Sequence, residues 1–346
     1  MPRLLLVATW ALLACTGGSD PPAGHHATPD GGSPADSGTS PDTGHPSDTG
    51  GADTGPLDGT RLTLTDGTVV QGELVASYDH SLWWHPSDET TWAVFDPTAW
   101  ALYPDDHSLH FVSSADLTRF QAVALAPDTP RYAEVLQTQG VVVAHMPLPG
   151  PSMVIMGNEG YHLDEDGYGS FAWDLVQTDA KGRRFHGSGT ANADYLVWDQ
   201  PILAPTDGMV VELVRDAPDN LPGSYVDGAV NNMVGLWVSG QTYLYLLHMR
   251  QGTIPASLHV GDTVLAGDLL GRVGNAGVSL EPHMHITGMY YEVEPVGPSG
   301  TVRTWSIPVQ WQDLWVADSP AGPGEAQPWA VPQTGDYIDD EPIAVP

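Results

Sequence analysis

Two histidines separated by one residue, His283 and His285, are the most chemically suggestive feature of the sequence. On a β-strand the side chains of residues i and i+2 point to the same face, so this spacing predicts two imidazole rings facing one site. An imidazole binds metal ions and moves protons near neutral pH. Such a pair is a weak signal by itself, and its meaning depends on the residues that position it.

Glycine-rich segments lead up to the histidine pair. Residues 260–271 hold two Gly-Asp turns, Val-Gly-Asp-Thr-Val and Ala-Gly-Asp-Leu-Leu-Gly, and residues 271–277 form a tight glycine loop. Farther upstream, residues 201–210 contain the sequence Ala-Pro-Thr-Asp-Gly. Residues 243–249 predict a strand whose end carries His248.

These segments together resemble the lysostaphin-type (LytM-like) zinc metallopeptidases. That family carries the Gly-Asp rhythm, then a glycine loop, then His-x-His, in the order and spacing found here, although Leu258 replaces its first Val. Its Tyr-x-His strand end is matched imperfectly, since Tyr245 stands three residues before His248. The resemblance spans residues 155–290. It implies an open antiparallel β-sheet peptidase domain that hydrolyses peptide bonds in bacterial peptidoglycan.

The resemblance also implies a Zn²⁺ ion (zinc) held by a histidine, an aspartate and the second histidine of His-x-His. The usual His-x-x-x-Asp spacing is absent, but a variant group places a histidine before a Tyr-Ala-x-Asp-Phe strand, which residues 171–175 resemble. By this likeness we assign His162, Asp174 and His285 as zinc ligands. Three protein ligands with a fourth position open to water are typical of catalytic zinc.

A competing ligand pair, His186 with Asp194, lies downstream in the sequence. We favour His162 and Asp174, because the variant group has a hairpin inserted after its aspartate and residues 177–198 would form that insertion. We expect this insertion and residues 214–232 to border the substrate groove, since loops usually carry specificity.

His248 and His283 are the catalytic residues that the resemblance implies. One ring would accept a proton from water and pass it to the leaving amine, or both would stabilise the tetrahedral state. The sequence does not divide these roles between them. A His-Glu-x-x-His helix is absent, so a glutamate base is not expected.

Three other interpretations compete with an active metallopeptidase. A degenerate homologue would keep the fold as a cell-envelope scaffold or regulator that binds peptide or an amidase partner, although all five candidate site residues are present. A lipoyl or biotin carrier needs a lysine at a hairpin tip, whereas the only lysine, Lys181, lies outside the Gly-Asp rhythm. A serine hydrolase of the common kind needs a Gly-x-Ser-x-Gly turn, which the sequence lacks.

The chain begins with features of an exported lipoprotein. Arg3 precedes an apolar run over residues 4–13, which suits a signal peptide and is shorter than the roughly 20 residues of a membrane-spanning helix. Residues 12–15 resemble a lipobox, and Cys15 is the only cysteine. We therefore expect Cys15 to be lipidated and the protein to be anchored in the cell envelope. Thr16, rather than an aspartate, follows Cys15, which favours the outer membrane.

The sequence predicts a mainly β protein with a small N-terminal antiparallel β barrel before the peptidase domain. Its predicted parts are a signal peptide (1–14), the lipidated Cys and a disordered linker (15–56), the barrel (57–125), the LytM-like domain (140–316) and a loosely packed Pro-rich, acidic tail (317–346). The predicted strands are residues 61–65, 68–74, 81–85, 91–95, 100–103, 209–214, 234–238, 242–247 and 264–270. A short helical linker is expected within residues 116–137.

The charge balance limits the partners of the protein. The sequence has 43 acidic and 11 basic residues. A nucleic-acid partner would need lysine and arginine to neutralise phosphates, so none is expected. The partners that remain are peptidoglycan peptides as substrate and a membrane reached through the N-terminal lipid anchor.

Overall fold

The computed structural model describes residues 57–78, 82–84, 99–104, 108–157, 171–225, 229–294 and 301–343. The predicted signal peptide, Cys15, the linker and the predicted strand at 91–95 lie outside these residues. Within the described residues the chain is mainly β, as predicted, and it holds one α-helix, α1 (Tyr132–Gln139). No helix in this part of the chain is long and apolar enough to cross a membrane.

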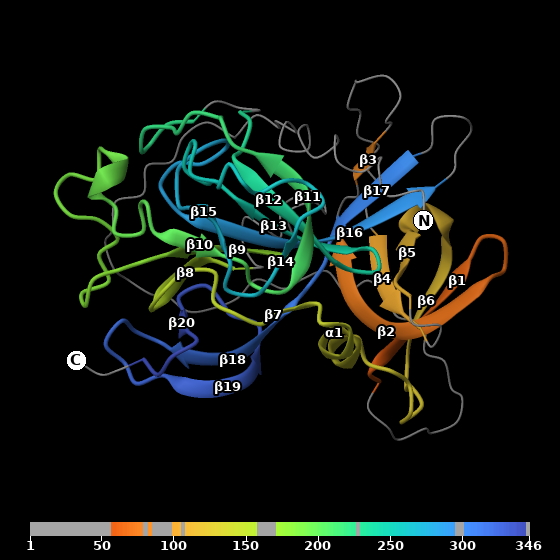
Figure 1. The fold of residues 1–346 in the computed structure, drawn as a ribbon. Helices are drawn as coiled ribbons and strands as arrows, with labels where there is room; N and C mark the ends of the chain where they lie inside the picture. The colour runs from red at the N-terminus through yellow and green to blue at the C-terminus, as the bar shows by residue number, and fades with distance from the viewer. Residues whose placement is uncertain are drawn as a thin grey trace, which may run out of the picture.

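The N-terminal part of the described chain forms a five-stranded antiparallel sheet (Figure 1). Its order is β5-β4-β2-β1-β6, and its strands are β1 (Gly59–Leu64), β2 (Val69–Tyr78), β4 (Ala99–Tyr103), β5 (His110–Ser113) and β6 (Leu117–Val123). The β1–β2 turn forms at Asp66-Gly67, because Gly67 adopts a φ of 87° and the Asp66 carboxylate accepts a hydrogen bond from the Thr68 N–H at 2.8 Å. The small core of this sheet contains Leu62, Leu102 and Val112.

The predictions for this module are confirmed only in part. A closed barrel would require β5 to pair with β6, and the described pairings contain no such contact, so the barrel stays a prediction. β3 (Leu82–Trp84) was expected in this module, but it pairs with β17 (Thr301–Ser306) of the large sheet. The short helical linker expected within residues 116–137 is met by α1, which begins at Tyr132 and ends at Gln139, whereas residues 117–123 pair with β1 as strand β6.

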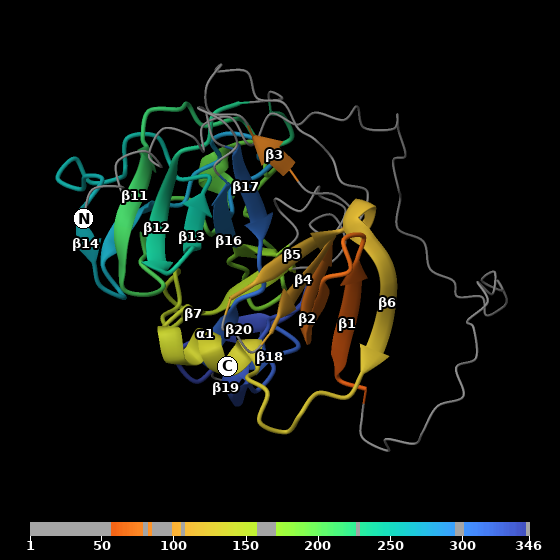
Figure 2. The same ribbon diagram turned by 90° about the vertical axis from the view of Figure 1, so that its right-hand side faces the viewer.

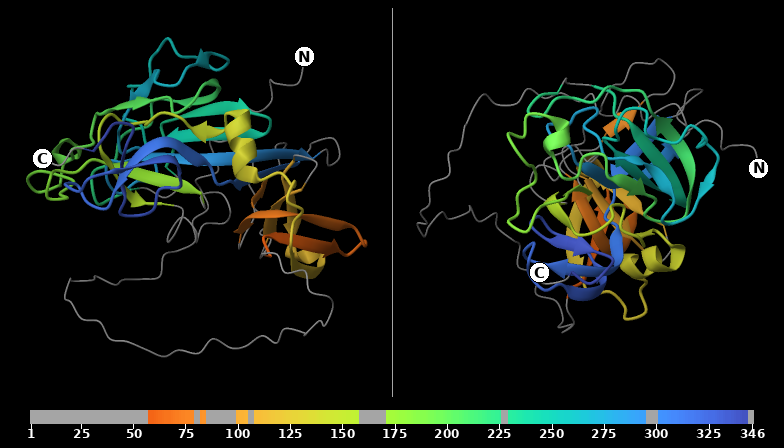
Figure 3. Two further views of the ribbon diagram at one scale, coloured as in Figure 1. Left: turned by 90° about the horizontal axis from the view of Figure 1, so that it is seen from below. Right: turned by 60° about the vertical axis from the view of Figure 1, so that its left-hand side comes forward.

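Most of the other described strands build a 13-stranded sheet (Figures 1 and 2). Its main path is β14-β11-β12-β13-β16-β9-β8-β20-β18-β19, with β17, β3 and β7 attached beside it. The strands not yet named are β7 (Val142–Val143), β8 (Ser152–Met156), β9 (Ala172–Val176), β11 (Gly208–Val214), β12 (Met233–Ser239), β13 (Thr242–Leu247), β14 (Thr263–Val264), β16 (Met284–Glu294), β18 (Gln310–Ala317), β19 (Glu325–Ala330) and β20 (Tyr337–Asp339). Figure 3 shows the N-terminal sheet at one end of the molecule.

Three strands predicted in the peptidase region, 209–214, 234–238 and 242–247, correspond to β11, β12 and β13. The predicted strand at 264–270 is instead two short strands, β14 and β15 (Leu269–Arg272). A turn separates them, in which the Leu265 N–H donates to the Asp268 carboxylate at 2.8 Å and the Asp268 N–H donates to the Leu265 carbonyl at 2.9 Å. β15 then leaves the large sheet and pairs with β10 (Pro201–Leu203).

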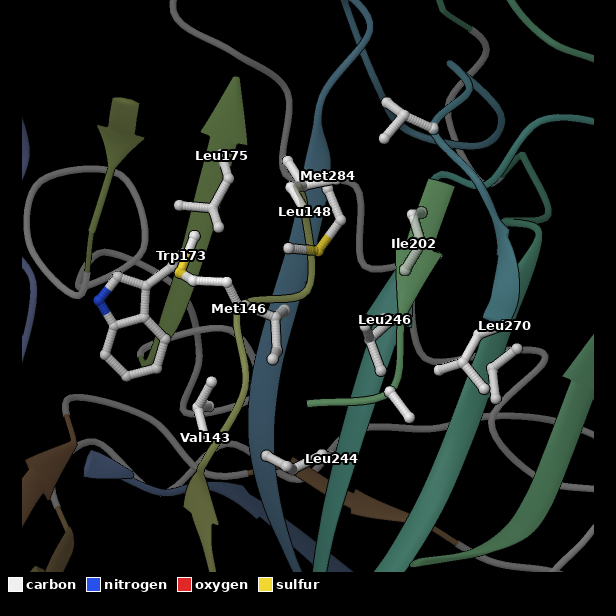
Figure 4. Close-up of a cluster of buried hydrophobic side chains, with 14 of the residues drawn as sticks. Val143, Met146, Leu148, Trp173, Leu175, Ile202, Leu244, Leu246, Leu270 and Met284 are labelled. Carbon is white, nitrogen blue, oxygen red and sulfur yellow. The ribbon is translucent and has the colours of Figure 1, made fainter. Parts of the chain in front are cut away.

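One face of the large sheet carries the main hydrophobic core (Figure 4). The core side chains of its central strands are 0% exposed and include Trp173 and Leu175 of β9, Leu244 and Leu246 of β13, and Met284 and Ile286 of β16. Successive side chains of a strand point to opposite faces. Asp174 and His285, which lie between these core residues, therefore point to the other face of the sheet.

The C-terminal residues are part of the large sheet, so the prediction of a loosely packed tail is wrong for them. β20 pairs with both β8 and β18, and Ile338 within it is fully buried. The buried Trp173 indole N–H donates to the Pro332 carbonyl at 2.9 Å. The Pro-rich, acidic composition suggested a solvated segment, but strand pairing and burial of these few apolar residues offset the loss of chain entropy.

Candidate functional site

Strand pairing places Asp174 beside His285. The two residues are directly opposite each other in the antiparallel β9–β16 pair, a position in which side chains on the same face come into contact. The Asp174 Oδ1 atom lies 2.9 Å from the His285 Nδ1 atom. The register of two strands that are 111 residues apart in sequence therefore joins two of the predicted zinc ligands.

His283 joins the same carboxylate from just before β16. Its Nε2 atom lies 3.4 Å from Asp174 Oδ1. On the other side of the ring, Nδ1 lies 2.8 Å from the Glu281 carbonyl oxygen and 3.3 Å from Ser279 Oγ. The two histidines of the His-x-His segment thus face one site, as their spacing predicted, and both meet the carboxylate of Asp174 there.

His248 reaches the site from the end of β13. Leu247 pairs with His285 across the sheet, and the chain then turns at His248, whose φ is 61°. Residues other than glycine rarely adopt this conformation, and it is retained where the surrounding structure enforces it. The His248 ring centroid lies 4.6 Å from that of His283 and 5.7 Å from that of His285.

The glycine loop at residues 271–277 holds this turn in place. The Gly274 N–H donates to the His248 carbonyl at 3.0 Å, and a Cβ atom on Gly274 would lie 2.3 Å from the Arg250 backbone nitrogen. The His248 Nδ1 atom lies 2.7 Å from the carbonyl oxygen of Ala276 in the same loop. The loop is glycine-rich because its backbone must lie against the backbone that follows β13.

A carbonyl contact determines the tautomer of His248. A carbonyl oxygen only accepts hydrogen bonds, so Nδ1 carries the proton in the neutral His248 ring. Both nitrogens of His283 face acceptors, which are the Glu281 carbonyl oxygen and the Asp174 carboxylate. The unprotonated Nε2 of His248 is then able to bind a metal ion or accept a proton. Histidines that bind metals in proteins are commonly oriented in this way by a carbonyl on the other ring nitrogen.

Burial and charge give the two rings different pKa values. Burial, followed by the neighbouring His283 and His285 rings, lowers the pKa of His248 well below its usual value. Burial also lowers the pKa of His283, but the charge of Asp174 and the hydrogen bond to it oppose burial, and the net shift is upward. The cluster therefore combines a neutral imidazole, an imidazole that retains its proton more readily, and a buried carboxylate.

The donor atoms of this cluster fit a zinc ion. Ligand nitrogens of His248, His283 and His285 lie within 4.8 Å of one another. With bonds of about 2.0 Å, the ligand atoms of a tetrahedral zinc site are about 3.3 Å apart, and the 2.9 and 3.4 Å contacts of Asp174 Oδ1 are close to that value. Mixed imidazole and carboxylate ligands are those that catalytic zinc commonly uses.

The structure brings together four of the five predicted site residues, which are Asp174, His248, His283 and His285. His162 lies outside the described residues, so its role as a ligand stays a prediction. The competing His186 is exposed, its backbone N–H donates to the Asp194 carbonyl at 2.9 Å, and it is absent from the histidine group found among the described residues.

The loops expected to border the groove both contact the segment that orients the catalytic rings. Arg184, in the hairpin of residues 177–198, forms an ion pair with Glu281. The Asn220 amide, in the loop at 214–232, donates to the carbonyl oxygens of Gly277 and Ser279 at 2.7 and 3.0 Å. An open cavity of about 640 Å³ lies along this second loop, lined by Leu213, Val214, Arg215, Asp216, Ala217, Pro218, Asn220, Ala229 and Val230.

Sequence reasoning missed the residues that orient the rings. Ala276 and Glu281 act through backbone carbonyls, and their residue types carry no signal for that role. Ser279 is a weak signal, because it lies four residues before His283 in the segment that joins the glycine loop to the histidine pair.

Residues 193–298 match the family model described as Peptidase family M23. The match includes His248, His283 and His285, and it begins after Asp174, so the placement of Asp174 rests on strand pairing. The resemblance to lysostaphin-type peptidases inferred from the sequence is confirmed by this match. No curated protein matches the chain.

Several solved structures are similar to parts of the chain. The catalytic domain of the prophage-encoded M23 protein EnpA from Enterococcus faecalis is 19% identical over 48% of this chain and 94% of its own, with a TM-score of 0.27. A putative glycyl-glycine endopeptidase LytM from Ruminococcus gnavus is 20% identical over 50% of this chain and 61% of its own, with a TM-score of 0.29. Lysostaphin from Staphylococcus simulans, an antimicrobial peptidase, is 20% identical over 42% of this chain and 48% of its own, with a TM-score of 0.26.

Proposed function

We propose that this chain, which carries a domain of peptidase family M23, is a zinc-dependent endopeptidase that hydrolyses peptide bonds of bacterial peptidoglycan. The observation that supports the proposal most strongly is that His283 and His285 both meet the carboxylate of Asp174, while ligand nitrogens of His248, His283 and His285 lie within 4.8 Å of one another. Three elements distant in sequence, β9, β13 and the start of β16, deliver these groups to one face of the sheet.

In this mechanism Asp174, His285 and His162 would hold the zinc. Zinc, when bound, supplies a Lewis acid for the scissile carbonyl and lowers the pKa of water at the site. His248 and His283 present their Nε2 atoms beside the ligands, as the contacts of their Nδ1 atoms require. Between them, these two rings accept a proton from the attacking water, return it to the leaving amine and donate hydrogen bonds to the developing oxyanion.

Peptidoglycan is the proposed substrate because the matched family includes the lysostaphin-type peptidases that the sequence resembles. The contacts of residues 177–198 and 214–232 with the site support a groove bordered by loops, which suits an extended peptide. Purified sacculi, a pentaglycine peptide and an unfolded protein such as casein form a suitable substrate panel. Release of peptides from sacculi without cleavage of casein is the expected result.

We also propose that the mature protein is anchored in the cell envelope through a lipid on Cys15, with the outer membrane as the favoured location. Support comes from the lipobox-like residues 12–15 and from the position of the only cysteine. Labelling of cells with a radioactive fatty acid tests the proposal. Incorporation into the wild type and none into Cys15→Ala is expected, and equal labelling of both would contradict it.

Metal content of the purified protein tests the zinc site. Zinc is expected at about one per chain in the wild type and in His186→Ala, and it is expected to be lost in His162→Ala, Asp174→Ala and His285→Ala. Zinc lost in His186→Ala but retained in His162→Ala would move the ligand assignment to the competing pair. A wild type that binds no zinc after reconstitution, and releases nothing from sacculi, would overturn the enzyme proposal in favour of an inactive envelope scaffold.

A further inference from the structure

Three asparagines from different segments meet beside the catalytic residues. They are Asn192 of the hairpin at 177–198, Asn220 of the loop that follows β11, and Asn275 of the glycine loop. The Asn192 side-chain amide donates to the Asn220 carbonyl at 2.7 Å, and its Oδ1 atom lies 3.1 Å from the Asn275 side-chain amide. Because the amide of asparagine has both a donor and an acceptor, Asn192 contacts two other segments at once.

The loop that carries Asn220 runs along the glycine loop and the residues after it. The Asn220 N–H donates to the Asn275 carbonyl at 2.9 Å, and the Gly223 N–H donates to the Leu280 carbonyl at 2.7 Å. Leu280 stands three residues before His283. The loop is therefore attached beside the stretch of chain that leads into His283.

Asn275 is the buried member of this junction and is 0% exposed. Its side-chain amide also contacts Ser279 Oγ at 2.7 Å, and its N–H donates to the Asp219 carboxylate at 2.7 Å. Buried polar groups need partners, and a lost partner leaves a desolvation penalty. Removal of Asn192 takes a partner away from both the Asn275 amide and the Asn220 carbonyl.

The hairpin reaches the loop through this one side chain. Among the described residues, the bond from Asn192 to Asn220 is the only hydrogen bond or ion pair between residues 177–198 and residues 214–225. Each segment also has a contact of its own with residues 277–281. With Asn192 in place the two segments form one connected border of the site, and without it they are held separately.

We propose that Asn192 is a positioning residue that joins residues 177–198 and 214–225 into one wall of the substrate groove, and that this wall holds the bound peptide beside His283. The inference deepens the proposed function and rests on it for the identity of the peptide. A loop that is ordered before binding loses less conformational entropy when a ligand binds. The wall is therefore expected to act on peptide affinity more than on the chemical step.

Hydrogen exchange of the full chain measures whether Asn192 holds the loop. In Asn192→Ala the amide protons of residues 214–225 are expected to exchange about fivefold faster, as for the loss of one hydrogen bond, whereas those of β16 keep their rates. Thr190→Ala is the matched control, because Thr190 is exposed and its hydroxyl contacts Ser188 of the same hairpin at 2.8 Å. This control is expected to match the wild type.

Equilibrium binding measures the consequence for the peptide without hydrolysis. A soluble cross-linked peptide dimer prepared from sacculi is titrated into the zinc-free full chain in a calorimeter. Its Kd is expected to rise about fivefold in Asn192→Ala and to stay at the wild-type value in Thr190→Ala. With zinc restored, KM of Asn192→Ala is expected to rise by a similar factor while kcat stays within about twofold of the wild type.

Asn192→Asp guards against a fold lost through truncation, because it keeps the size of the side chain and removes the donor to the Asn220 carbonyl. Its exchange rates and Kd are expected to rise in the same direction. Exchange or Kd at the wild-type value in both Asn192 variants would overturn the inference, even if the protein hydrolyses sacculi, and so would a wild type that binds no peptide. Faster exchange and a raised Kd in a chain that hydrolyses nothing would support the inference while removing the enzyme proposal.

Discussion

The two faces of the large sheet bury different kinds of side chain. On one face, Leu244, Met284 and Ile286 are all 0% exposed and contact other apolar side chains without directional partners. On the other face, Asp174 and His283 are also buried, at 9% and 8% exposure, but each meets a specific polar atom. Packing on the first face depends on the volumes of the side chains. Burial on the second face depends on the distance and direction of each hydrogen bond, since a buried polar group without a partner is costly.

A second polar group on the site face extends the comparison. Glu212 of β11 pairs with Gly235 of β12, which pairs with Tyr245 of β13, and Tyr245 pairs with Thr287, two residues beyond His285. The Tyr245 ring covers Gly235, where a Cβ atom would lie 2.6 Å from the ring. Glu212 is 3% exposed, and burial raises its pKa to about 8 although a hydrogen bond with Tyr245 lowers it.

The largest expected effect comes from removing the shared carboxylate of the site face. Asp174→Ala is expected to lose zinc and to reduce peptide hydrolysis by about a thousandfold or more, because the histidine rings lose their common partner. Zinc content and release of peptides from sacculi measure the change. Asp179→Ala, which removes a carboxylate paired with Arg183 on the hairpin, is the control and is expected to match the wild type; loss of zinc in both variants would contradict the assignment.

A large-to-small substitution on the core face is expected to lower the free energy of unfolding more than the rate of peptide hydrolysis. Trp173→Ala removes a side chain with 0% exposure and is expected to lower the free energy of unfolding by about 3–5 kcal/mol. Urea denaturation followed by circular dichroism measures this change. Trp329→Ala, at a side chain 37% exposed, is expected to cost far less, and equal losses would show that burial on this face does not determine stability.

The pH dependence of stability tests whether Glu212, on the site face, is buried in its protonated form. The folded protein keeps its proton up to a pH of about 8, whereas the unfolded chain releases it near 4.5. Between these values the folded state binds more protons, so wild-type stability falls relative to Glu212→Gln as pH rises, by up to about 1.4 kcal/mol per pH unit. The difference stays constant below the lower value and above the upper one. Parallel stability curves for the two proteins would contradict the shifted pKa.

The smallest expected effect is at Tyr245. Its hydroxyl accepts a hydrogen bond from Tyr291 at 3.1 Å and is hydrogen-bonded to Glu212. Tyr245→Phe keeps the ring over Gly235 and is expected to lower stability by about 1 kcal/mol. It is also expected to raise the pKa of Glu212 further, because a hydrogen bond that stabilises the charged form is lost. A lower pKa, obtained from stability measured against pH with Glu212→Gln as reference, would oppose this account.

Local pattern was sufficient to predict some strands and one pair of site residues. Residues 209–214, 234–238 and 242–247 are rich in valine, tyrosine and other residues that favour strands, and the structure has β11, β12 and β13 there. His283 and His285 were predicted to share a face because the side-chain period of a strand is two. The same local reading failed at 264–270, where a turn separates β14 from β15 and outweighs residue preference.

The sequence by itself determined the mainly β character, the glycine loop and the resemblance of residues 193–298 to peptidase family M23, because these follow from side-chain period, backbone freedom and the order of short segments. Only the tertiary structure decided that Asp174 lies opposite His285, that Ile338 is buried between β8 and β18, and that Arg184 reaches Glu281. Each of these depends on the register between segments far apart in the chain. A shift of one residue in that register would turn Asp174 into the core and leave its neighbours on the site face.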